Sequence, residues 1–190
     1  QFGVSKVQAG QLTMLAAFMG AALRVCGGWL ADRWGGINTL TLVLAVVAGS
    51  LVLIGFAGTS LVLTTLLMML CFAALGAGNG ALFQLVPLRW PASTAVAGSM
   101  IGEIGALGGG LVPAAMGLSK QHLGTFGWGF LFFAALALLV LVLLRVMQGG
   151  WTRRWVAAGG RARRPATASG ATAWPSGRPH PQPLSHVSQE

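Results

Sequence analysis

The stretch MGAALRVCGGWLADRWGG, residues 19–36, places an arginine inside an apolar run of small side chains. Arg24 lies eight residues before Asp32, and Asp32 with Arg33 marks the polar end of the run. Eight residues of α-helix rise about 12 Å, so Arg24 lies well inside the segment. A charge at that depth usually faces a bundle interior or a water-filled path. The alternative is an arginine that snorkels from near a helix end, and the position of Asp32 disfavours it.

The composition predicts a membrane protein. The chain of 190 residues is 55% hydrophobic and 8% charged, with a mean hydropathy of +0.74, which excludes an ordinary soluble domain. Five apolar runs are each long enough to cross a bilayer as a helix, which takes about 20 residues. We therefore predict an all-α membrane protein with five transmembrane helices. The runs cover about residues 9–31, 38–57, 60–86, 95–118 and 126–147.

The residues that carry enzymatic or metal chemistry are scarce. Cys26 and Cys71 both fall inside predicted helices, where free cysteines are commonly buried packing groups. The chain has only three acidic residues, and its histidines, His122, His180 and His186, fall in a loop and in the C-terminal tail. No metal-ligand spacing and no catalytic set of residues follows. We therefore expect no metal, no cofactor and no enzymatic activity.

The arginines gather in every second connection between the predicted helices, and so at one end of them. The loop with Arg33, the loop with Arg89 and the C-terminal tail hold most of them. By the positive-inside rule these segments face the cytoplasm, which leaves the N-terminal end outside. A chain that begins outside is explained most simply as a fragment without its earlier helices.

Residues 148–190 differ in composition from the membrane region, residues 1–147. They are rich in Arg, Ala, Gly, Pro and Ser, and they hold most of the net charge of +9. A segment with almost no aliphatic residues cannot bury a core, so we predict a disordered cytoplasmic tail. We expect attraction to anionic lipid or no role rather than nucleic-acid binding, because no nucleic-acid motif accompanies the arginines.

Helical periodicity places Arg24 on a stripe of small residues. Such stripes let neighbouring helices approach closely. No acidic residue lies within two turns of Arg24, so its partner is on another helix or is a bound anion. A guanidinium is planar and permanently charged, and it binds oxyanions or carboxylates through paired hydrogen bonds. The stripe consists of Ala17, Gly20, Ala21, Gly27, Gly28 and Ala31.

Two further helices carry glycine-rich faces. The face of residues 76–87 has two amides and one aromatic ring, and it suits either a substrate path or ordinary helix packing. Residues 98–110 form overlapping ridges of small residues, around Glu103. That carboxyl group is either a protonatable coupling group or a residue near the headgroups. The two faces consist of Gly76, Asn79, Gly80, Phe83, Gln84 and Pro87, and of Gly98, Gly102, Gly105, Ala106, Gly109 and Gly110.

The stretch GGWLADRWGG, residues 27–36, resembles a loop signature of the major facilitator superfamily. Together with residues 76–91 and 98–117, the region around it resembles the nitrate/nitrite porter family. The resemblance covers roughly residues 2–147. It implies a half-bundle that corresponds to helices eight to twelve of twelve, with the N-terminal half of the transporter missing from this chain.

The resemblance also implies roles for individual residues. Arg24 matches a substrate-binding arginine of that family. Glu103 is a candidate for proton coupling from its position inside a helix, not from the resemblance. The other residues assigned to the substrate are Asn79, from its helix face, and the glycine-rich nitrate signature, Gly102, Gly105, Ala106, Gly108 and Gly109. A conformational latch is assigned to Gly28, Asp32, Arg33 and Gly35.

These observations predict secondary transport of nitrate or nitrite across the cytoplasmic (inner) membrane by alternating access. The partners are the anion, the lipid bilayer and the missing N-terminal half. Coupling to protons and exchange of nitrate for nitrite both stay open. Two alternatives stay open. One is a porter of another small or organic anion, and the other is a membrane-anchored interaction or sensor protein whose helices hold the basic tail.

Overall fold

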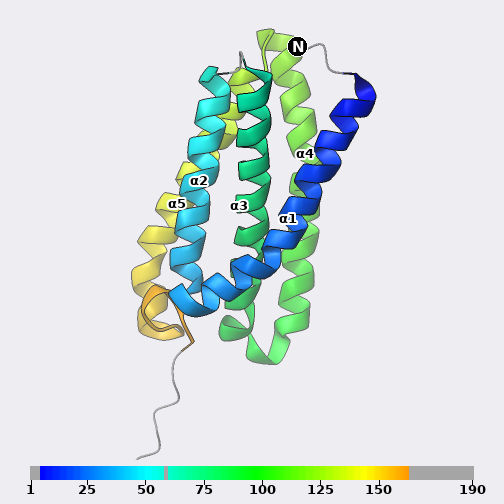
Figure 1. The fold of residues 1–190 in the computed structure, drawn as a ribbon. Coiled ribbons are helices and arrows are strands. Elements are labelled where there is room, and N and C mark those ends of the chain that lie inside the picture. The colour runs from blue at the N-terminus through cyan, green and yellow to red at the C-terminus, as the bar shows by residue number, and fades with distance from the viewer. Residues whose placement is uncertain (1–4, 58–59, 163–190) are drawn as a thin grey trace, which may run out of the picture.

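The computed structural model describes residues 5–57 and 60–162. Within these ranges the chain forms five long helices and no strand, as predicted (Figure 1). All five are long and apolar enough to cross a membrane. His180, His186 and most of the predicted tail lie outside the described residues. The helices are α1 (Lys6–Trp34), α2 (Gly36–Ala57), α3 (Leu61–Arg89), α4 (Thr94–Leu123) and α5 (Gly127–Arg154).

Short polar signals set several helix ends. The Ser5 hydroxyl accepts a hydrogen bond from the Gln8 backbone N–H, and the Gln8 side chain accepts one from the Ser5 backbone N–H. This reciprocal pair satisfies two donors that the first helical turn leaves unpaired. At the start of α3, Ser60 caps the Leu63 N–H in the same manner. The turn from α1 to α2 needs Gly35, whose φ of 95° disfavours any residue with a Cβ.

The helices run alternately up and down, so the charged residues gather at two ends. Arg33, Arg89, Arg153 and Arg154 end α1, α3 and α5 at one end of the bundle, which we call the basic end. Lys120 lies near the close of α4, at the opposite end (Figure 1). The alternation expected from the sequence is therefore present in the fold.

Helix α3 is the centre of the bundle. It packs against α1 on one side and against α2 on the other, and α2 packs in turn against α5. Helix α1 crosses α3 obliquely, whereas α2, α3 and α5 are more nearly parallel (Figure 1). Helix α4 is peripheral, and Ser119 is the one residue of that helix that is buried. The bundle therefore leaves α4 with little of its surface covered.

The chain beyond α5 packs against the basic end. Helix α5 continues to Arg154, beyond the boundary at residue 147 that composition suggests. The turn that follows, residues 155–161, folds back onto the start of α2 and is called the C-terminal turn below. Val156 is fully buried there with Ile37 and Leu144. The part of the tail from Gln148 to Arg161 is thus helix and packed turn, where we expected disorder, because its tryptophans and Val156 supply apolar surface to bury.

The glycines at the crossing of α1 and α3 generate a stability prediction. A Cβ added at Gly80 would contact the carbonyl oxygen of Arg24 and lie 2.7 Å from the Gly28 nitrogen. We expect Gly80→Ala to force the helices apart and lower the free energy of unfolding by about 1–3 kcal/mol. Thermal or denaturant unfolding of the purified protein in detergent micelles measures this change.

Gly49→Ala is the matched control, because nothing lies within 4 Å of a Cβ added at Gly49 in α2. Alanine is the better helix former, so this variant keeps or gains up to about 1 kcal/mol of stability. Equal stability changes in the two variants would contradict the close crossing.

Candidate functional site

The site begins with the close approach of two helix backbones. A Cβ at Gly76 would contact the carbonyl of Gly20, and one at Gly27 would contact Ala77. Together with Gly80 against Arg24, these contacts run along the stripe of small residues predicted on α1. Backbone lies on backbone, as small residues permit in membrane helices. The crossing therefore carries the base of the Arg24 side chain directly onto α3.

Asn79 of α3 receives the guanidinium. The Asn79 Oδ1 accepts hydrogen bonds from Arg24 Nε at 3.1 Å and from Arg24 Nη2 at 2.7 Å. The partner expected on another helix is thus a neutral amide. Because an amide oxygen carries no net charge, it fixes the direction of the guanidinium without neutralising it.

Phe83 completes the contact from α3. Its ring centroid lies 5.5 Å from the Arg24 Cζ, within the range of a cation–π contact. Phe83 follows Asn79 by one helical turn, so both side chains lie on the same side of α3. The sequence placed Phe83 on this face but did not assign it to the site. Its spacing of four residues from Asn79 was the available signal.

The chemistry of this group favours an anion. Arg24 and Asn79 are exposed, and Arg24 forms no ion pair with any residue of 5–57 or 60–162. A guanidinium has more N–H donors than the two that Asn79 occupies. The remaining donors and the uncompensated charge can accept a small oxyanion through charge-assisted hydrogen bonds. The described residues supply a single cation at this position.

The glycine-rich signature of α4 is not brought to this group. Nothing in the structure lies within 4 Å of a Cβ added at Gly102, Gly105, Gly108 or Gly109. Helix α4 approaches the site through Gly98, where an added Cβ would lie 3.4 Å from Phe83 Cε1. The roles assigned to these glycines and to Ala106 stay predictions, and their face is open in this chain.

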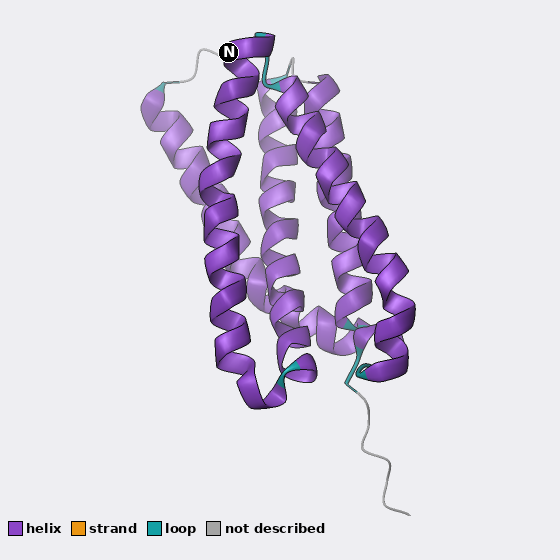
Figure 2. Ribbon diagram, turned by 180° about the vertical axis from the view of Figure 1, so that it is seen from behind, coloured by secondary structure: helices purple, strands orange, loops and turns teal. Residues whose placement is uncertain are grey.

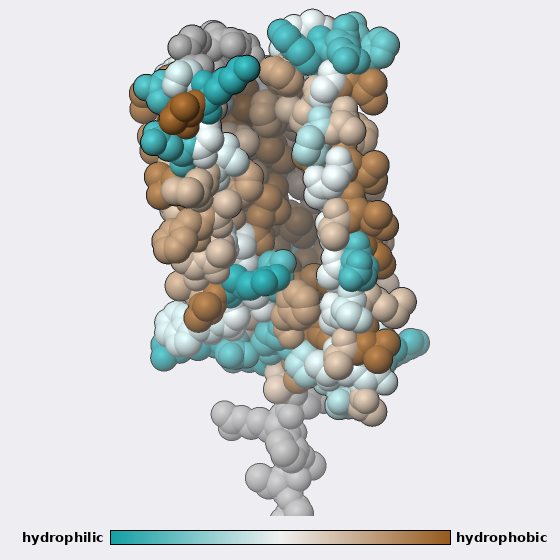
Figure 3. Space-filling model, turned by 90° about the vertical axis from the view of Figure 1, so that its right-hand side faces the viewer, coloured by the Kyte–Doolittle hydropathy of each residue, from teal (hydrophilic) through white to brown (hydrophobic). Residues whose placement is uncertain are grey.

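Figure 3 shows the flank of the molecule on the side of α1 and α4. Hydrophilic side chains gather at both ends, and apolar side chains cover most of the middle. A hollow runs between two columns of side chains, and smaller hydrophilic patches interrupt the apolar surface in its lower half. This flank therefore suits contact with a mostly apolar surface that carries a few polar groups.

The residues assigned to the latch lie at the turn from α1 to α2. Arg33 stacks over the ring of Trp29, with its Cζ 4.2 Å from the ring centroid. Asp32 is exposed, while Gly35 is covered by Gly159 of the C-terminal turn. Gly28 lies beside Gly80 at the crossing with α3. The fold therefore joins this loop to the end of α5, a contact that the loop motif did not indicate.

Glu103 is exposed on α4. No group of three or more metal-ligating side chains occurs among the described residues. Cys71 is buried and Cys26 is exposed, and both are free thiols. The structure does not test the role of Glu103 in coupling, so that role stays a prediction.

The chain is similar to known proteins whose names refer to nitrate or nitrite transport. Over 155 residues the chain is 30% identical to a "Nitrite extrusion protein" of Bacillus subtilis, covering 80% of this chain and 38% of that protein. Over 144 residues it is 26% identical to a "Probable nitrate transporter NarT" of Staphylococcus aureus, covering 76% and 37%. It is 31% identical over 141 residues to a "Probable nitrate/nitrite antiporter NarK1" of Thermus thermophilus, covering 65% and 32%.

These relatives confirm the resemblance to the nitrate/nitrite porter family. They are named as transporters rather than enzymes, and the chain spans less than two fifths of the length of each. No family model matches the sequence, and no solved structure matches it.

The neutral partner of Arg24 generates a binding prediction. Asn79→Asp keeps the shape of the side chain but places a carboxylate against the guanidinium. We expect the affinity for nitrate to fall about tenfold or more, since a hydrogen bond to a charged group contributes about 1.5–3 kcal/mol. Isothermal titration of the longest polypeptide that carries this sequence measures the change.

Gln11→Glu controls for the added charge, because it makes the same chemical change at an exposed position of α1 and is expected to leave the affinity unaltered. Undiminished nitrate binding by the Asn79→Asp variant would show that Arg24 does not bind the anion.

Proposed function

We propose that this chain supplies the C-terminal half of a transporter that moves nitrate or nitrite across the cytoplasmic membrane. The proposal rests chiefly on one observation, the Arg24 guanidinium directed by a neutral amide and paired with no carboxylate among the described residues. A permanent charge inside an apolar helix is costly unless it faces a polar path or a partner. An anion supplies that partner during part of the transport cycle.

The site that we propose is incomplete in this chain. The relatives named as nitrate or nitrite transporters are more than twice as long as the matched region. A second set of helices would contribute further donors opposite Arg24 and would cover the open glycine face of α4. Anion sites of secondary transporters lie between such halves, and the halves rock about the site to give alternating access.

The remaining elements receive roles consistent with this mechanism. Gly102, Gly105, Ala106, Gly108 and Gly109 would border the anion path and permit close helix contact. Gly28, Asp32, Arg33 and Gly35 would latch the basic end when the transporter opens to the outside. Glu103 is the candidate for proton coupling.

The basic end would face the cytoplasm, in keeping with the positive-inside rule. The membrane domain would extend through α5, which continues to Arg154, and the segment after the C-terminal turn would form a basic cytoplasmic tail.

Arg24→Lys tests this function. Lysine keeps the positive charge but loses the planar, paired donors. We expect saturable uptake of nitrate or nitrite into proteoliposomes to fall at least about tenfold, which corresponds to about 1.4 kcal/mol. The protein to reconstitute is the longest polypeptide that carries this sequence, and we expect the 190-residue chain alone to give no saturable uptake.

Arg145→Lys is the matched control. Arg145 lies on α5, where its Nη1 donates to Gln148 Oε1. The Arg145→Lys variant is expected to take up nitrate or nitrite as fast as the unaltered protein does. Uptake unaffected by Arg24→Lys would leave the family assignment intact and exclude Arg24 from the anion site. Uptake of carboxylates in place of nitrate and nitrite would favour the porter of another anion.

A further inference from the structure

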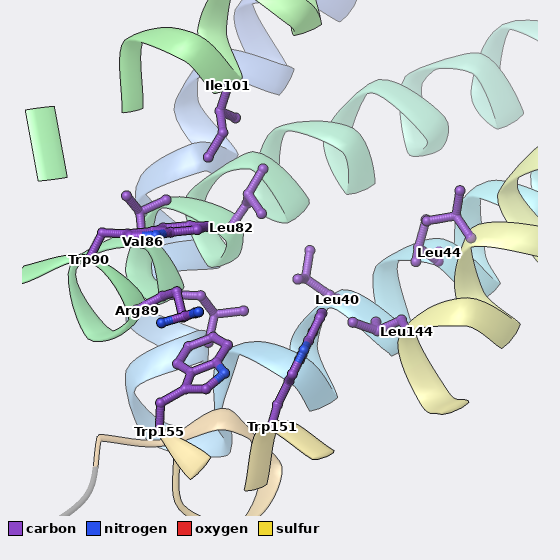
Figure 4. A pocket seen from close by; sticks show the side chains of 12 residues that line it. Leu40, Leu44, Leu82, Val86, Arg89, Trp90, Ile101, Leu144, Trp151 and Trp155 are labelled. Atoms are coloured by element: carbon purple, nitrogen blue, oxygen red, sulfur yellow. The ribbon is translucent and has the colours of Figure 1, made fainter. Parts of the chain in front are cut away.

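A cavity of about 570 Å³ lies at the basic end, apart from the group around Arg24. Helices α2, α3 and α5 and the residue after α3 form most of its wall (Figure 4). The lining is aliphatic except for Arg89 and the indoles of Trp90, Trp151 and Trp155. Cavities of this size hold small organic molecules. A single cation at an otherwise apolar cavity suits a ligand with one anionic end.

The cavity is elongated along the helices of the bundle. On α5 its lining runs from Trp151 to Val140, a rise of about 16 Å. On α2 it continues from Leu40 to Leu44, one turn further along that helix. Arg89 is the last residue of α3, so the charge lies at the outer end and the aliphatic lining extends inward. This polarity matches an amphiphile with its head at the membrane surface.

The splay of α4 and α5 opens the cavity sideways. The two helices meet near their connecting turn, where Ser119 Oγ donates to the Thr125 carbonyl at 2.9 Å and Gly129 lies against Met116. From there they diverge toward the basic end (Figure 2). Of α4, only Ile101 reaches the cavity. A lipid molecule could therefore enter between α4 and α5 without crossing the bundle.

Arg89 is available to such a ligand. Its Cζ lies 5.4 Å from the ring centroid of Trp90 and 5.9 Å from that of Trp155. It forms no hydrogen bond or ion pair with any residue in the part of the chain that the structure describes. Guanidinium groups bind phosphate oxygens in pairs, and tryptophans gather where lipid headgroups meet the apolar core.

We propose that this cavity binds an anionic membrane phospholipid. The phosphate of the headgroup accepts hydrogen bonds from Arg89, and one acyl chain lies along Leu40, Leu44 and Val140. The indoles of Trp151 and Trp155 border the glycerol region. The bound lipid fills the space between α4 and α5 and ties the loosely packed α4 to the rest of the bundle.

Native mass spectrometry tests the site. The intact chain is purified in nonionic detergent, mixed with 1-palmitoyl-2-oleoyl-phosphatidylglycerol, and released from micelles in the gas phase. We expect one lipid to stay bound, and we expect Arg89→Gln to lower its occupancy about tenfold. Arg33→Gln is the matched control, since Arg33 stacks on a tryptophan at the same end but does not line the cavity. That control is expected to retain the lipid.

A second variant tests the apolar part independently of the charge. Val140→Trp fills the cavity from a partly exposed position, so it is expected to remove the bound lipid while Arg89 stays in place. Equal lipid occupancy in the unaltered protein, Arg89→Gln and Val140→Trp would overturn the proposal. Retention of palmitate without phosphatidylglycerol would also overturn it, in favour of a carboxylate amphiphile.

Discussion

The contact of α1 with α3 is the constraint on which the rest of the structure depends. Gly27, Gly76 and Gly80 allow the two backbones to touch along the middle of the bundle. No other residue type permits this distance, because a Cβ would overlap a carbonyl group of the facing helix. The crossing sets the position of Arg24 relative to α3, and α3 in turn holds α2 and α5. The proposed anion site and the frame of the fold thus share one contact.

That contact explains how a charge is kept in an apolar helix. Asn79 takes two donors of Arg24 without cancelling its charge, and Phe83 offers the face of its ring. A carboxylate at the same place would neutralise the charge of the guanidinium and leave little attraction for an anion. The neutral partner is therefore the feature that separates a structural ion pair from a proposed binding group. Arg89 at the basic end repeats the pattern, with tryptophans in place of an acid.

Much of the fold could be predicted from the sequence, because helix length and apolar composition are local properties. The five spans, the alternation of basic ends and the small-residue face around Arg24 all follow from them. The identity of the partner, Asn79, does not, since periodicity gives the face of a helix but not the face that it meets. The C-terminal turn was missed because its composition resembles that of the tail, while Val156 gains its burial from distant residues, Ile37 and Leu144. The cavity at Arg89 depends on the splay of α4 from α5, which no local pattern encodes.

The most direct test of the central claim is the distance between the anion and Arg24. Carbon–nitrogen dipolar recoupling in solid-state NMR, with ¹⁵N-nitrate and ¹³C-arginine in the longest polypeptide that carries this sequence, reports contacts of this kind. The account predicts that saturating nitrate dephases one guanidinium carbon signal and that this signal is missing in Arg24→Lys. Dephasing of a different arginine alone, or of none while nitrate is demonstrably bound, would contradict the account.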